Sequence, residues 1–171
     1  MRTSKSGPGR VSPIGERLAE RAAKLPIGLA ARLARVAGGE PLADVAGVGP
    51  SQLDALYALA HASLTAGRWG AARQVLSMLV ALEPHRPRSW AALGVLLDRL
   101  GDRREAAAFY AMAAAIEDDA DLWVRSAECA AAAGNRRGAR RSADAALRLP
   151  GATPFARQRA ALVLEEVGHD D

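Results

Sequence analysis

The side chains that carry out chemistry are few and widely spaced in this chain of 171 residues. Cys129 is the only cysteine, which excludes an internal disulfide and a cysteine-based metal cluster and fits a reducing cytosol. The three histidines, His61, His85 and His169, show no metal-binding spacing, and the sequence contains neither a phosphate-binding loop nor a nucleophile elbow. We therefore predict a protein that is not an enzyme and that uses no metal and no cofactor.

The function is therefore expected to depend on a binding surface. Seven residues are predicted to line a groove for an extended peptide with proline or leucine side chains: Tyr57, His61, Leu64, Ala91, Val95, Val124 and Glu128. Tyr57 would form an aromatic wall, over an apolar floor of small side chains. A second interpretation is that the chain's own N-terminal segment covers Tyr57 and Leu64. His61 is interpreted as a packing or hydrogen-bonding residue at the groove wall, in preference to a pH switch.

A repeat of helical hairpins would position these residues. The clearest unit, from Trp90 to Tyr110, follows the W-x2-L-G and A-x3-aromatic pattern of a tetratricopeptide (TPR) repeat. Gly101 would end the first helix of that unit, with Gly67 lying 34 residues earlier and Gly134 lying 33 residues later. Apolar and small residues keep the same phase around all three glycines. First helices of stacked hairpins line the concave face, where the seven groove residues would lie.

The predicted fold is all-α, with three TPR hairpins in a short right-handed solenoid. Few β-branched runs and many alanines support helices, because alanine is the best helix former. Two starting signals of the capping-box type are Ser51 with Asp54 and Asp102 with Glu105, and Thr153 followed by Pro154 should begin a capping helix. The predicted parts are a disordered basic tail (1–13), an N-terminal helical segment (14–50), the repeats (51–84, 88–118 and 120–149, together 51–150) and the capping helix (153–167).

The net charge of +4 is unevenly distributed. Residues 1–36 contain eight Lys/Arg and two Glu, a net +6, whereas the remainder is slightly acidic. Aromatic residues are absent from the basic tail, so we interpret the tail as solvated and predict no nucleic-acid partner. No run of 18 apolar residues is present, so stable membrane insertion is not expected.

A second basic cluster belongs to the second helix of repeat three: Arg136, Arg137, Arg140, Arg141 and Arg148. Second helices face the convex side, so a solvated basic face is the first interpretation. Binding of an acidic partner is the alternative, and nucleic acid is disfavoured because no stacking aromatics accompany the arginines. Cys129, beside Ala130, is interpreted as a small buried packing residue.

Three segments go beyond a generic TPR pattern: 38–43 (GGEPLA), 53–60 (LDALYALA) and 126–129 (SAEC), the last followed by Gly134. They resemble the class II chaperones of bacterial type III secretion systems, small TPR proteins that hold the translocators. The resemblance covers residues 38–149 in the same order of parts. The sequence departs from the family in two ways. Family members are commonly acidic, whereas the N-terminus of this chain is basic. Family members also have aromatic residues at the positions of His61 and Leu64.

The resemblance implies a non-enzymatic, cytoplasmic bacterial chaperone. Its partner would be a hydrophobic translocator protein, held by a segment containing proline and leucine in the concave groove. Tyr57, His61, Leu64, Ala91 and Val95 match groove positions of the family. The resemblance also implies a homodimer formed through residues 14–36. The alternative function is a generic TPR adaptor that assembles a cytosolic protein complex.

Overall fold

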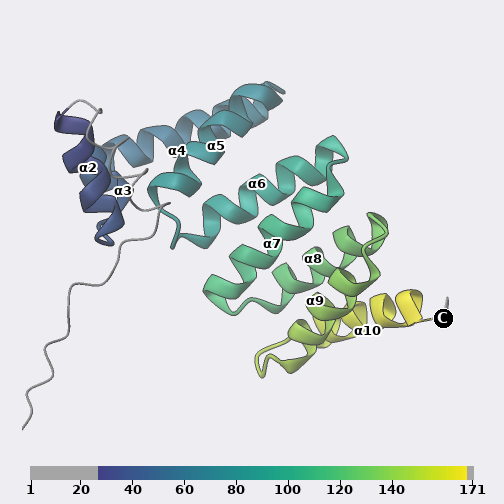
Figure 1. The fold of residues 1–171 in the computed structure, drawn as a ribbon. Coiled ribbons are helices and arrows are strands. Elements are labelled where there is room, and N and C mark those ends of the chain that lie inside the picture. Colours follow the sequence, from purple (N-terminus) through teal and green to yellow (C-terminus); the bar gives the residue numbers. More distant parts are fainter. Residues whose placement is uncertain (1–26, 169–171) are drawn as a thin grey trace, which may run out of the picture. The chain divides into compact units, whose positions relative to one another are not determined.

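The computed structural model describes residues 27–168, and every regular element within that range is an α-helix (Figure 1). The all-α prediction is thereby confirmed for these residues. Two compact units divide the chain, Met1–Gly47 and Val48–Asp171. The described part of the first unit contains α2 (Ile27–Ala37) and α3 (Leu42–Ala46), which pack on each other. The predicted basic tail, and residues 14–26 of the predicted helical segment, lie outside the described residues.

The second unit is a row of helical hairpins closed by a single helix (Figure 1). Each helix packs on the next along the chain, and the last helix packs on both of the two preceding ones. The hairpins stack because each helix has an apolar side that a lone hairpin would leave in water. The helices are α4 (Pro50–Thr65), α5 (Trp69–Leu82), α6 (Pro87–Leu100), α7 (Arg103–Glu117), α8 (Ala120–Ala132), α9 (Arg136–Arg148) and α10 (Pro154–Gly168).

The glycines predicted to end the first helices do so. Gly67, Gly101 and Gly134 follow α4, α6 and α8 with φ angles of 68°, 85° and 71°. This left-handed conformation reverses the chain and suits glycine, because a side chain there would crowd the following carbonyl oxygen. The repeat in the sequence therefore corresponds to a turn that recurs every 33 or 34 residues.

The interior of the second unit is built from leucines and alanines. Leu76, Leu79, Leu96 and Leu97 are almost fully buried, and so are six alanines that recur in the repeats: Ala60, Ala72, Ala106, Ala127, Ala139 and Ala143. Alanine keeps neighbouring helix axes close, because little side chain separates them. Gly94 lies at the same kind of position on α6, directly under the ring of Tyr110 on α7.

Replacing Gly94 by alanine should destabilise the fold by about 1–3 kcal/mol. A Cβ atom at this position would lie 3.0 Å from the Tyr110 ring, which is itself buried, so the added methyl group would crowd the interface between α6 and α7. Urea unfolding of the variant measures the effect. Gly70→Ala on α5, where a Cβ atom would meet nothing within 4 Å, is the matched control. Equal stability of the two variants would contradict the close approach of α6 and α7.

Neither of the two predicted capping boxes forms. The first helix of repeat one begins at Pro50, and its Gly49 amide donates to the side-chain Oε1 of Gln52 at 3.1 Å, so Asp54 is not the capping acceptor. Gln52 replaces Asp54 because the N-cap residue is Gly49, two residues before the predicted Ser51, with proline at the first helical position.

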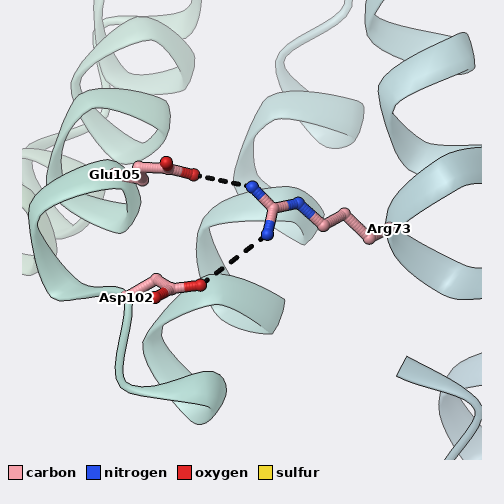
Figure 2. A network of polar contacts seen from close by, with 3 residues as sticks. All are labelled: Arg73, Asp102 and Glu105. Atoms are coloured by element: carbon pink, nitrogen blue, oxygen red, sulfur yellow. Dashed lines mark hydrogen bonds and ion pairs between the residues drawn. The ribbon is translucent and has the colours of Figure 1, made fainter. Parts of the chain in front are cut away.

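At α7, Asp102 precedes the helix but accepts no capping hydrogen bond. Figure 2 shows that Arg73 of α5 instead reaches across to both predicted capping residues. Its guanidinium lies 3.7 Å from Asp102 and 2.9 Å from Glu105. The two carboxylates therefore tie repeat two to repeat one. All three side chains are about half exposed, so the ion pairs contribute little, at most about 1 kcal/mol each.

The predicted start of the last helix is confirmed. The Ala156 amide donates to Thr153 Oγ1 at 3.0 Å, and Pro154 is the first residue of α10. Buried Ala156, Ala160, Val163 and Val167 form the face that α10 turns toward the repeats. Its remaining face is mostly exposed, as expected for a helix that ends a stack.

Candidate functional site

A cavity of about 550 Å³ lies between the first helices of repeats one and two. We call it the α4–α6 cavity. Pro50, Leu53, Asp54 and Tyr57 of α4 form one side, and Pro87, Arg88 and Ala91 of α6 form the other, with Glu83, Arg86 and Glu117 completing it. The cavity thus brings together two of the seven predicted groove residues, Tyr57 and Ala91.

Tyr57 is the central side chain of the α4–α6 cavity. Its hydroxyl lies 2.6 Å from Ser89 Oγ on α6 and donates at 3.4 Å to the carboxylate of Glu83. The guanidinium of Arg88 lies over its ring, 4.8 Å from the centroid, in a cation–π contact. The side chain is therefore held at its hydroxyl and on one face of its ring, and only part of its surface is open to a ligand.

Charges surround the apolar part of this cavity. Asp54, Glu83 and Glu117 contribute carboxylates, and Arg86 and Arg88 contribute guanidinium groups. Glu83 is only 8% exposed, and its carboxylate pairs with Arg86 at 3.3 Å. The apolar contacts come from Leu53, Ala91 and two prolines. Such a lining can hold small apolar side chains of a peptide while the charged rim contacts its main chain or polar residues.

Glu128 lies in a smaller cavity, of about 190 Å³, between α6 and α8. Asp98 of α6 lines the same space, as do Arg125 and Ala132 of α8. The carboxylate of Glu128 is ion-paired with Arg159 of α10. The first helices therefore carry two neighbouring hollows, one between each pair of adjacent repeats.

Val124 is a core residue, which corrects its prediction as part of the groove floor. It is 2% exposed and belongs to the main apolar cluster. The position corresponds to Ala91 of repeat two, which is only half buried. The difference follows from packing: α7, α9 and α10 all pack on α8, whereas only α5 and α7 pack extensively on α6. At this exposure Val124 offers almost no surface to a bound peptide.

The other predicted residues have different degrees of exposure. Val95 is 45% exposed on α6 and His61 is exposed on α4, so both are accessible. Leu64 is half buried and packs against the core cluster. None of these three lines the α4–α6 cavity, and their role in binding stays a prediction.

Several residues that line the α4–α6 cavity are absent from the predicted set of seven: Pro50, Leu53, Glu83, Arg86, Pro87 and Glu117. Glu83, Arg86 and Pro87 belong to or border the α5–α6 connection, where helix periodicity gives no signal. Leu53 and Pro50 precede Tyr57 by one and two helical turns. That spacing is a usable signal, because residues four and seven apart share a helix face.

Cys129 is buried, as predicted, and is 5% exposed. Burial, together with the nearby carboxylates of Asp98 and Glu128, raises the pKa of its thiol to about 12. A thiol held in this form is a poor nucleophile, because the thiolate is the reactive species. Burial likewise raises the pKa of the Tyr110 phenol to about 12.

The stability of the protein should fall in alkaline solution partly because of Cys129. The unfolded thiol ionises near its ordinary pKa of 9.0, whereas the folded thiol keeps its proton up to about pH 12. Over that window the unfolded state binds fewer protons, so the free energy of unfolding decreases as pH rises. Urea unfolding at about pH 8 and about pH 10 should show a smaller decrease for Cys129→Ala than for the wild type. Parallel pH dependences in the two proteins would contradict the raised pKa.

Comparison with known proteins places the chain in a family. Residues 16–122 match the family described as "Bacterial transcriptional activator domain". The chain belongs to this family. The matched range includes α2 and α3 and the hairpins α4–α5 and α6–α7, and it extends into α8. No curated protein matches the chain significantly.

Several solved structures similar to this family member come from type III secretion. A type III secretion complex from Aeromonas hydrophila is 27% identical, with a TM-score of 0.64, and the match covers 81% of this chain and 95% of that chain. PcrH, solved with the chaperone-binding region of PopD, is 28% identical, with a TM-score of 0.57 over 71% of this chain and 95% of that chain. The translocator chaperone SycD of Yersinia enterocolitica, at 21% identity, a TM-score of 0.56 and coverage of 75% and 97%, supports the fold alone.

These structures confirm the resemblance to class II translocator chaperones and the TPR-like helical fold. The structural matches cover a larger share of this chain, 81% and 71%, than the family match, which spans 107 of the 171 residues. Within the described range, no helix combines the length and the apolar composition needed to cross a lipid bilayer.

Proposed function

We propose that this protein is a non-enzymatic bacterial chaperone that binds an extended segment of a hydrophobic type III secretion translocator. The observation that carries the proposal is the likeness to PcrH, which has been solved with the chaperone-binding regions of PopD and PopB at 28% and 26% identity to this chain. A translocator exposes apolar surface that associates in water before export. Covering one segment of it would keep the client available in the cytoplasm.

The α4–α6 cavity is the proposed centre of client binding. Leu53 and Ala91 offer a shallow apolar surface for client side chains. The position of Tyr57 is already fixed by its contacts with Ser89 and Arg88. A preordered site lowers the entropy lost on binding, so the client segment bears most of the ordering cost. That cost favours moderate affinity, which suits release of the client at export. Residues 51–150 would form the client-binding domain, and self-association would use residues 14–36.

Isothermal titration calorimetry with a peptide of the Pro-x-Leu-x-x-Pro pattern tests this function. The wild-type chain should bind the peptide saturably, and Tyr57→Ala should bind it about tenfold or more weakly, because the ring and its anchoring hydrogen bonds are lost. Tyr57→Phe separates the ring from the hydroxyl and should lose less. Unchanged affinity in Tyr57→Ala would place the site elsewhere, and absence of binding to any Pro/Leu peptide would count against the chaperone function.

The family match favours a second candidate, an adaptor that assembles a cytosolic regulatory complex. Capture of partners from the native cell distinguishes the two. Recovery of a secreted protein with apolar segments, lost in Tyr57→Ala, supports the chaperone. Recovery of DNA-binding regulators, retained in Tyr57→Ala, supports the adaptor.

A further inference from the structure

A separate cavity of about 610 Å³ opens between α7 and α9, above α8. We call it the α7–α9 crevice. Arg104 of α7 and Arg141 and Arg148 of α9 line it, together with Trp123 and Ser126 of α8. It shares no lining residue with the α4–α6 cavity. The crevice lies on the second helices of repeats two and three, so a ligand there would not compete with a client between the first helices.

The charged side chains that line the α7–α9 crevice are all positive. Its lining contains three arginines and no aspartate or glutamate. In the part of the chain that the structure describes, no salt bridge joins any of these three guanidinium groups to a carboxylate. The acidic residue in the first turn of α7, Glu105, is held by Arg73 of α5 (Figure 2).

The buried hydroxyl groups at the floor of the crevice already have hydrogen-bond partners within the protein. Ser126 Oγ donates to the Ala107 carbonyl at 2.9 Å and lies 2.9 Å from Ser142 Oγ, which joins α7, α8 and α9. Around these hydroxyls the lining includes five alanines and Gly138 of α9. Small side chains allow the main chain of a bound segment to approach the helices closely. Trp123, which is half buried, offers one apolar wall.

We propose that the α7–α9 crevice binds an acidic, extended segment of a partner protein. Arg141 and Arg148 are seven residues apart on α9, about 10 Å along the helix, which is about the length of three extended residues. Carboxylates two to four residues apart on the partner can therefore reach both guanidinium groups, and Arg104 faces them from α7. Arginine suits this role because its planar guanidinium pairs with carboxylates in a bidentate manner. A nucleic acid would find only Trp123 to stack on.

An NMR titration tests the proposal. The ¹⁵N-labelled full chain is titrated with an acetylated decapeptide that alternates glutamate and alanine, and separately with the same peptide carrying glutamine for glutamate. We expect saturable shifts of the Gly138, Ser142 and Ala145 amides with the acidic peptide alone. Binding should weaken at higher salt, because the contacts are ionic. The double variant Arg141→Ala/Arg148→Ala should weaken the affinity about tenfold or more.

Arg137→Ala/Arg140→Ala is the matched control. Both of these arginines are exposed on α9 and lie outside the crevice lining, so the variant removes the same charge from the same helix. It should weaken binding by less than about threefold, since only screened long-range attraction is lost. Equal weakening in the two double variants would overturn the proposal and indicate diffuse attraction. So would equal shifts with the glutamine peptide, no binding at all, or tighter binding of a DNA duplex than of the acidic peptide.

Discussion

Replacing Leu93 by alanine should lower the free energy of unfolding by about 2–5 kcal/mol. Leu93 is 2% exposed and belongs to the cluster that joins α6 to its neighbours. The loss has two parts. The variant loses the favourable free energy of burying the removed atoms, and it keeps a cavity that the surrounding alanines cannot fill. Because alanines supply so much of this core, each buried leucine carries a large share of the apolar area.

The matched control is Leu162→Ala on α10. Leu162 is 55% exposed, so its truncation should cost no more than about 0.5 kcal/mol. Urea unfolding of both variants, followed by circular dichroism, gives the comparison. Similar small losses in both would contradict the phase of the repeat, because Leu93 marks the core position of its motif.

The second large effect concerns binding. Ala91→Glu should weaken the affinity for a Pro-x-Leu-x-x-Pro peptide by about thirtyfold or more, which corresponds to about 2 kcal/mol. The new carboxylate would fill apolar space in the α4–α6 cavity and would join three carboxylates already there, those of Asp54, Glu83 and Glu117. A carboxylate placed against an apolar peptide side chain loses hydration when the peptide binds. Arg86 already pairs with Glu83, and Arg88 already lies over the ring of Tyr57.

Ala115→Glu provides the control for that variant. Ala115 is exposed on α7, a second helix, and lines neither the α4–α6 cavity nor the α7–α9 crevice. It makes the same change of charge and size, so the affinity for the peptide should stay within about twofold of the wild type. Calorimetry under one set of conditions compares the three proteins. Equal losses in Ala91→Glu and Ala115→Glu would indicate a general charge effect and would remove the cavity from the proposed site.

Candidate site residues could be predicted only in part. Tyr57 and Ala91 were found because the repeat assigns them to first helices, and they do line one cavity. Glu83 and Arg86 were missed because they adjoin a connection, where the order of residues does not reveal which helix they will face. Val124 was misplaced because α10 packs on α8, and the covering of one helix by another cannot be inferred from the period of either.

The sequence by itself determined the helices, the glycine turns and the phase of the core. These depend on neighbours within about one repeat, through hydrogen bonds four residues apart and apolar positions at helical spacing. Only the tertiary structure decided which polar side chains pair between repeats. Arg73 forms ion pairs with the carboxylates of Asp102 and Glu105, which the sequence alone predicted to cap the helix. Pairing and exposure depend on how closely separate helices pack, and that distance is set by all the side chains between them.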